Sequence, residues 1–249
     1  MTKTTYKIFK VILFSSISFC VNAVPIHWTD WIDSSSSAGF QGNGVITTAT
    51  STVNVTYANP QGVGFYQPSG GTDYWQNARS GRDPATSPYT SATVDNIPTG
   101  TDIIALRFSG TQTLSFSEAI ANPVFSYVSL NGNGYAFDQN FEILSFGDAS
   151  EGNDSGYWGA GTSSKSIVDL GGGVFEYQLL GTGEPHGTIR FVGEFDTVSW
   201  RSLTNEFWNG FTVGIEGTAD EINPVPVPAA VWLLGSSLIG LIGMRKKPL

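Results

Sequence analysis

The stretch TQTLSFSEAIANPVFSYVSLNGNG, at residues 111–134, decides the fold of this chain. Apolar residues alternate with polar ones at Leu114 and Phe116 and again over residues 124–130, and the stretch ends in two Asn-Gly pairs. A period of two residues is typical of a β-strand that buries one face. Asn-Gly pairs favour the tight turns that join antiparallel strands. The stretch therefore predicts short antiparallel strands, each ended by a turn.

Short runs with the same alternation recur along the chain, bounded by Gly, Asn, Pro or Asp. They contain Val53, Val55 and Tyr57, Ile104, Leu106 and Phe108, Phe175, Tyr177 and Leu179, Ile189 and Phe191, and Phe211, Val213 and Ile215. No window between the termini shows clear helical periodicity. We predict an all-β fold, a jelly-roll-like antiparallel β-sandwich over residues 24–221 with about nine or ten strands.

Residues 58–97 interrupt this pattern. The segment is rich in Gly, Pro, Ser, Asn and Tyr, and Pro68, Pro84 and Pro88 would interrupt a strand. Long irregular segments in compact domains are often functional loops. We expect residues 67–93 to lie on the surface.

The N-terminus has the layout of a secretory signal peptide. Lys3, Lys7 and Lys10 precede an apolar stretch at residues 11–21, and small residues lead to Ala23. Residues 1–23 are therefore predicted to engage the Sec export machinery and to be removed by cleavage after Ala23. Cleavage would also remove the one cysteine of the chain, so the mature protein would contain no disulfide or thiolate metal site.

The C-terminus combines a proline motif, an apolar span and a basic end. The motif and the basic end are Val225, Pro226, Val227, Pro228 and Ala229, and Arg245, Lys246 and Lys247. A helix over about residues 229–244 would be about 24 Å long, which is short for a bilayer core of about 30 Å but workable if the membrane thins. The basic end would stay in the cytoplasm. A permanent membrane anchor is the alternative interpretation.

This tail resembles the PEP-CTERM sorting signal of Gram-negative bacteria, in the variant with a Val-Pro-x-Pro-Ala core, an Ala-x-Trp-Leu-x-Gly-Ser and Gly-Leu-x-Gly span, and a basic cluster. Val227 stands where the name-giving motif has Glu. The resemblance implies that residues 222–249 are a sorting signal and that an exosortase, an integral-membrane thiol transpeptidase-like enzyme, cuts at the proline motif. It also implies transient anchoring in the inner membrane, then a place at the cell surface or in an exopolysaccharide and biofilm matrix. Residues 116–217 are similar to other proteins with this tail, which supports the fold and the compartment only.

Charge and motifs exclude several classes of function. Residues 24–224 contain six of the 12 Lys and Arg residues and all 21 acidic residues. So acidic a surface repels nucleic acid and anionic lipid. No HExxH motif, phosphate loop or Gly-x-Ser-x-Gly elbow occurs. His27 lies only four residues past the predicted cleavage site, and His186 is better explained by a turn or a buried hydrogen-bonding role than by catalysis or metal binding. We predict that the chain is not an enzyme and has no catalytic residues.

A glycine-bounded loop at residues 147–156 is rich in oxygen ligands. Its candidate metal ligands are Asp148, Glu151, Asn153 and Asp154. Hard cations favour such side chains, so Ca²⁺ binding is a hypothesis. The spacing matches no EF-hand, and an ordinary solvated loop is the alternative.

Exposed aromatic residues suggest a carbohydrate site, because the apolar faces of sugars stack on Trp and Tyr. Tyr74, Trp75 and Trp158 are the candidate glycan contacts, since they lie in polar or glycine-rich loops. Trp208 is the next candidate, although it can instead plug one end of the sandwich.

Paired carboxylates could indicate a glycosidase. The acids on or near predicted strands are Glu142, Glu176, Glu194 and Glu206. Alternation places Glu176 on a solvated face, opposite Phe175 and Tyr177. The sequence therefore favours an exported, non-enzymatic structural or adhesive component linked to exopolysaccharide. A carbohydrate-binding module is the alternative, and a polysaccharide-acting hydrolase is the third interpretation.

Overall fold

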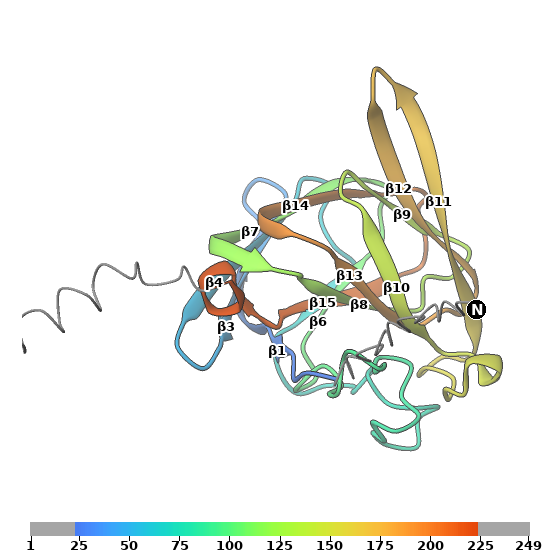
Figure 1. The fold of residues 1–249 in the computed structure, drawn as a ribbon. Coiled ribbons are helices and arrows are strands. Elements are labelled where there is room, and N and C mark those ends of the chain that lie inside the picture. The colour runs from blue at the N-terminus through green and yellow to red at the C-terminus, as the bar shows by residue number, and fades with distance from the viewer. Residues whose placement is uncertain (1–22, 224–249) are drawn as a thin grey trace, which may run out of the picture.

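A computed structural model describes residues 23–223, and it confirms the all-β class. Strands form two antiparallel sheets that pack against each other in a sandwich-like arrangement (Figure 1). Within the described residues there are sixteen strands, more than the nine or ten predicted, because several are short edge strands. Each pair of neighbouring strands is antiparallel.

The first sheet has seven strands. In spatial order they are β10 (Phe141–Phe146), β13 (Gly187–Phe191), β8 (Val124–Val128), β15 (Asn209–Ile215), β6 (Ile103–Leu106) and β5 (Phe65–Gln67), with β1 (His27–Trp28) paired to β15.

The second sheet has nine strands. In spatial order they are β11 (Gly161–Gly171), β12 (Val174–Gly183), β9 (Gly134–Phe137), β14 (Glu194–Ser202), β7 (Gly110–Ala121), β4 (Thr52–Asn59), β3 (Phe40–Thr47) and β2 (Asp30–Ser35), with β16 (Gly217–Thr218) paired to β7.

The main core lies between the two sheets and is strongly aromatic. The rings of Phe125 and Phe211 stack with centroids 4.9 Å apart, and Trp200 lies edge-on to both. The alternation predicted for β4 is confirmed, since Val53, Val55 and Tyr57 are buried in this core. Alternation therefore identified the inward face of this strand.

The segment at residues 68–102, here called the cover, packs on the outer face of the first sheet and lies below it in Figure 1 (teal). Trp75, Tyr89 and Ile97 of the cover are buried against Ile103 and Val128. The expectation that residues 67–93 lie on the surface is wrong for this buried part. The cover also explains why β8 is buried on both faces rather than on one.

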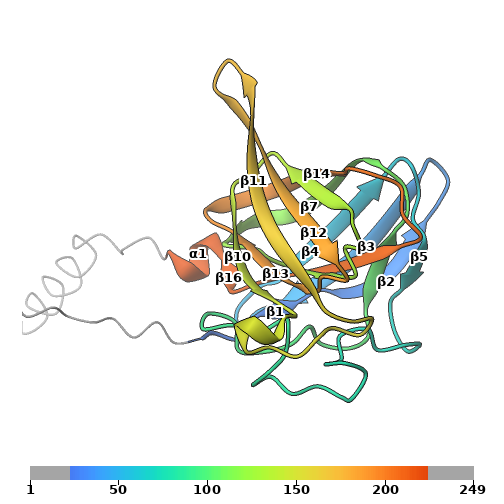
Figure 2. The same cartoon turned by 90° about the vertical axis from the view of Figure 1, so that its right-hand side faces the viewer.

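The β11–β12 hairpin projects away from the body (Figure 2). Its apolar tip residues Ile167, Leu170, Val174 and Phe175 are exposed because no second layer covers them. Phe175 is 43% exposed. The predicted alternation is confirmed at Leu179, which is buried, and at Tyr177, which packs against the main core, but it is wrong towards the tip. There the Glu176 side chain is largely buried and pairs with Arg201 at 2.9 Å, whereas Phe175 is in solvent.

The described chain ends in a single helical turn, α1 (Ala219–Ile222). Thr218 and Glu221 form a reciprocal capping box at its start. Figure 2 shows α1 on the left and the cover at the bottom, so the described chain ends on a side other than the one the cover occupies.

Candidate functional site

Five aromatic side chains meet where the cover borders the first sheet, and we call them the aromatic cluster: Phe65, Tyr74, Tyr157, Trp158 and Trp208. The Tyr74 and Trp208 ring centroids are 4.9 Å apart, and those of Trp158 and Trp208 are 6.3 Å apart. Edge-to-face contacts of this kind fix rings relative to one another. The cluster is thus an organised surface rather than scattered exposed rings.

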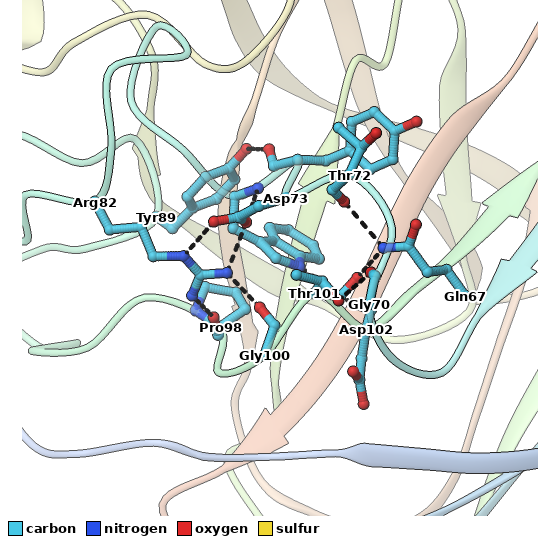
Figure 3. Close-up of polar contacts among 12 residues, drawn as sticks. Gln67, Gly70, Thr72, Asp73, Arg82, Tyr89, Pro98, Gly100, Thr101 and Asp102 are labelled. Atoms are coloured by element: carbon cyan, nitrogen blue, oxygen red, sulfur yellow. Dashed lines mark hydrogen bonds and ion pairs between the residues drawn. The ribbon is translucent and has the colours of Figure 1, made fainter.

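The cover holds Tyr74 in place through hydrogen bonds of its neighbours in the chain, Asp73 and Trp75. Asp73 accepts two hydrogen bonds from Arg82, at 2.7 and 2.8 Å, and the same guanidinium donates to the carbonyls of Pro98 and Gly100 (Figure 3). Such a bidentate pair fixes geometry as well as adding energy. On the other side of Tyr74, the indole N–H of Trp75 donates to the Asp102 carbonyl at 3.1 Å.

Tyr157 and Trp158 occupy the tip of a tight turn between Gly156 and Gly159. The two glycines exchange backbone hydrogen bonds of 3.0 and 3.3 Å. Gly156 lies directly on the buried ring of His186, so that a Cβ atom there would be 2.0 Å from His186 Cγ. This close approach requires glycine. His186 therefore supports the turn, in agreement with the buried structural role predicted for it.

His186 is completely buried. Its Nδ1 lies 3.1 Å from the Tyr89 hydroxyl, and its Nε2 has no partner among the described residues. Burial lowers the pKa of His186 from 6.5 to about 3, so the ring is neutral at ordinary pH.

Trp208 follows β14 on a short loop that leads into β15. Thr204 donates to Asn133 Oδ1 through both its backbone N–H and its hydroxyl, and the Glu206 N–H donates to the Arg107 carbonyl at 3.0 Å. Phe207 is 83% exposed between two restrained neighbours. An exposed large apolar side chain on an anchored loop is typical of an interaction site.

A hollow of about 290 Å³ lies beside the cluster. It is lined by Ser129, Asn131, Trp158, Glu184, Glu206, Phe207 and Trp208. This volume is close to the lower end of the roughly 300–1,000 Å³ found for small-ligand sites, which combine apolar walls with a few polar groups.

Two carboxylates give the hollow its electrostatic character. Glu184 accepts a hydrogen bond from the Ser129 hydroxyl, and Ser129 has a backbone φ of 56°, a left-handed conformation that is uncommon for serine. Glu206 accepts from the Asn209 side chain at 2.9 Å. Burial raises the pKa of Glu206 to about 7, with the charge of Glu184 adding to this effect and hydrogen bonds opposing it.

The three predicted glycan residues differ in how exposed their rings are. Trp158 is 42% exposed and lines the hollow. Tyr74 is half-buried behind it and packs against Trp158 and Trp208. Trp75 is fully buried against Tyr89, so the expectation that its ring contacts a glycan is wrong. Trp208, the next candidate after these three, forms part of the wall of the hollow.

Sequence reasoning missed Glu184 as a site residue and did not pair Glu206 with it. The Glu-Pro-His-Gly turn at residues 184–187 indicated only a connection between strands. In the structure this turn packs against the Gly-Tyr-Trp-Gly turn at residues 156–159, with Gly156 on His186 and Gly159 near Glu184, and local sequence patterns carry no signal of that contact.

The other acids considered for catalysis are not brought together. Glu142 pairs with Arg190 at 2.7 Å and Glu176 pairs with Arg201. Glu194 accepts a hydrogen bond from Asn223, and His27 lies on β1 beside a separate acidic hollow near α1. In this acidic hollow, the Glu221 carboxylate already accepts hydrogen bonds from the Thr48 and Thr50 hydroxyls and from the backbone N–H of Thr218.

Three of the four predicted calcium ligands have other structural uses. Asp148 caps the short helix η1 (Ala149–Glu151), Asn153 donates to the Phe146 carbonyl, and Asp154 accepts from Thr86 and Asn77. The fourth, the Glu151 side chain, lies outside the described part of the structure. Among the side chains that the structure describes, no three from His, Cys, Asp or Glu are grouped so that they could hold a metal ion. The described hydrogen bonds hold the loop internally and to the cover.

The terminal predictions fall outside the described residues, apart from Ala23 at the start of the described chain. They concern residues 1–22, the proline motif at Val225, Pro226, Val227, Pro228 and Ala229, and the basic end at Arg245, Lys246 and Lys247. No helix within residues 23–223 has the length and apolar character needed to cross a bilayer.

Comparison with protein-family models, with curated proteins and with solved structures finds no match to this chain.

Proposed function

We propose that this chain is an exported, surface-displayed carbohydrate-binding protein that acts as a non-enzymatic adhesive component of an exopolysaccharide matrix. The glycan site is the hollow walled by Trp158 and Trp208. The observation that carries this proposal is the presence in one hollow of two indole rings, two carboxylates and Asn131. Indole rings offer flat apolar surface to sugar rings, and the polar groups can accept hydrogen bonds from sugar hydroxyls.

Export and sorting are parts of the same proposal. The layout of residues 1–23 and the Val-Pro-x-Pro-Ala motif with its apolar span and basic end support a Sec-exported precursor that an exosortase-type enzyme processes. An orientation that presents the site outward is also consistent with α1 and the cover lying on different sides.

The finer fold assignment in this proposal is a jelly roll. Strand order β6-β15-β8-β13 in one sheet, opposite β7-β14-β9-β12 in the other, supports it. Chain connections from β6 through β9 alternate between the sheets, as they do again from β12 through β15, which is the pattern of two Greek keys.

A pull-down from a panel of insoluble and bead-coupled polysaccharides tests the proposal. The full-length protein should be retained on at least one glycan, and Trp158→Ala should reduce the retention at least about tenfold, equivalent to about 1.4 kcal/mol. Failure of the wild-type protein to bind any polysaccharide of the panel would remove the proposal.

Glycoside hydrolysis is a second candidate, favoured by one observation. Glu184 and Glu206 line the same hollow, and the raised pKa of Glu206 would suit a general acid. Reducing-sugar release from a bound glycan, abolished by Glu206→Gln, would support hydrolysis. Stable binding with no release would favour the adhesive function.

A further inference from the structure

We propose that the hollow selects glycans with free primary ammonium groups, such as de-N-acetylated amino sugars. This inference rests on the proposed function, since it names the class of glycan that the same site takes. Carboxyl groups on Glu184 and Glu206 are the ionisable side chains in its lining, and no lining residue is Lys or Arg. An ammonium group would therefore meet complementary charge, whereas a uronic acid would meet charge of its own sign.

The aromatic wall favours a cation as well. Indole rings attract cations through the negative face of their π-system, and ligand ammonium groups are recognised by aromatic cages of this kind. Trp158 already takes part in such a contact, since the Arg79 guanidinium carbon lies 4.5 Å from its ring centroid and 4.7 Å from that of Tyr157. Arg79 does not itself line the hollow.

The two carboxyl groups are held in position before any ligand arrives. Glu184 is fixed by Ser129, whose neighbour Leu130 donates its N–H to the Pro185 carbonyl at 3.0 Å. Glu206 is fixed by Asn209, which also accepts a hydrogen bond from the Tyr135 hydroxyl. Binding an ammonium group would therefore require little reordering of these side chains, which favours affinity.

Proton release from Glu206 on binding would distinguish an ammonium ligand from a neutral sugar. Besides burial, the charge of Glu184, from the turn before β13, raises the pKa of Glu206, and the charge of Glu206 in turn helps to raise the pKa of Tyr135 of β9. At pH 6 a carboxyl with a pKa of about 7 is mostly protonated. An ammonium ligand beside it would lower this pKa and drive a proton into solution.

The test is calorimetry of the full-length protein with three oligosaccharides of equal length: N-acetylglucosamine, glucosamine and glucuronic acid oligomers. We expect the glucosamine oligomer to bind at least tenfold more tightly than the acetylated one. Binding at pH 6 should release protons, seen as a dependence of the heat on the ionisation enthalpy of the buffer. Glu184→Gln and Glu206→Gln should reduce the preference to below threefold, and the latter should abolish the proton release.

Glu142→Gln is the matched control, since it removes one exposed negative charge at a separate site, and it should keep the full preference. Equal binding of the acetylated and free-amine oligomers, or tighter binding of the uronic acid oligomer, would overturn the inference and leave carbohydrate binding standing. Binding to none of the three oligomers would also overturn it, and the polysaccharide panel then decides separately whether carbohydrate binding survives.

Discussion

Gly156 shows how one residue positions the candidate site. The Cα of Gly156 lies against the His186 ring. The methyl group added by Gly156→Ala would therefore force the Tyr157–Trp158 turn outward or displace the histidine. Overpacking of this kind costs about 1–3 kcal/mol, so we expect a lower melting temperature together with weaker glycan binding. Gly64→Ala is the control, since its added methyl group would meet no atom closer than 3.3 Å and should have a smaller effect. Equal melting temperatures for the wild type and Gly156→Ala would contradict this packing.

Burial of His186 predicts how the stability of the protein depends on pH. Above pH 6.5 the imidazole is neutral in both the folded and the unfolded chain. Between pH 6.5 and about 3 the unfolded chain takes up a proton that the folded chain does not, because burial lowers the folded-state pKa. The contribution of His186 to the free energy of unfolding is therefore complete above pH 6.5 and falls by about 1.4 kcal/mol per pH unit below it.

The measurement is the difference in unfolding free energy between wild type and His186→Gln. This difference cancels the pH dependence that other groups add to the unfolding free energy. Asp102 is one of them: burial raises its pKa to about 6, so its contribution to stability grows as the pH falls. The stability advantage of wild type should shrink steadily from pH 6.5 to pH 4. A difference that stays constant over this range would show that His186 is not buried in the neutral form.

The cover is the element on which the site depends. Arg82→Gln would remove the bidentate pair with Asp73 and weaken the contacts to two carbonyls. Hydrogen bonds to charged groups contribute about 1.5–3 kcal/mol each, and partial exposure reduces this, so we expect about 1–3 kcal/mol in total. Proteolysis should then begin within residues 68–102 while the strands remain protected. Cleavage spread evenly over the domain would contradict the separate role of the cover.

Substitutions at the tip of the β11–β12 hairpin should change the unfolding free energy much less than substitutions in the first sheet beneath the cover. Leu170→Lys and Val174→Lys lie on exposed tip positions, so each should change the unfolding free energy by no more than about 0.5 kcal/mol. Ile103→Ala, at a fully buried position beneath the cover, should cost about 2–5 kcal/mol. Chemical denaturation of the three variants measures this contrast, and large losses at the tip would show that the hairpin packs on something else.

Elements differ in how far the sequence predicts them. Alternation identified β4 correctly because this strand has one buried face. It could not identify the double burial of β8, because the cover that causes it lies far away in the chain. It also misplaced Glu176 and Phe175, because periodicity assumes a second layer that the projecting hairpin lacks. Buried Trp75 illustrates the same limit, since a polar loop sequence does not reveal what the loop covers.

At the scale of the whole molecule, the candidate site joins segments that are distant in sequence. Trp158, Glu184 and Glu206 come from three separate connections between strands, and only the strand order brings them to one hollow. The sequence identified Trp158 as exposed and Glu206 as a candidate acid, but pairing them requires the topology. Sequence pattern did predict the all-β class, because that class follows from local alternation and turn residues alone.

Processing of the termini is a further prediction for the whole chain. The mature protein should begin after Ala23 and should lack the basic end at residues 245–247, because we propose that an exosortase-type enzyme removes the tail at the proline motif. Mass spectrometry of the protein from cells with and without the sorting enzyme measures both ends. A C-terminus at Leu249 in both strains would show a permanent anchor instead.

Carbohydrate binding at the hollow is the central claim, and one pair of affinities tests it most directly. Trp158 and Phe175 are almost equally exposed, but only the former lines the hollow. Calorimetry with the polysaccharide retained in the pull-down should give an affinity at least about tenfold weaker for Trp158→Ala than for wild type, and an unchanged affinity for Phe175→Ala. Equal affinities for the two variants would contradict the assignment of the site.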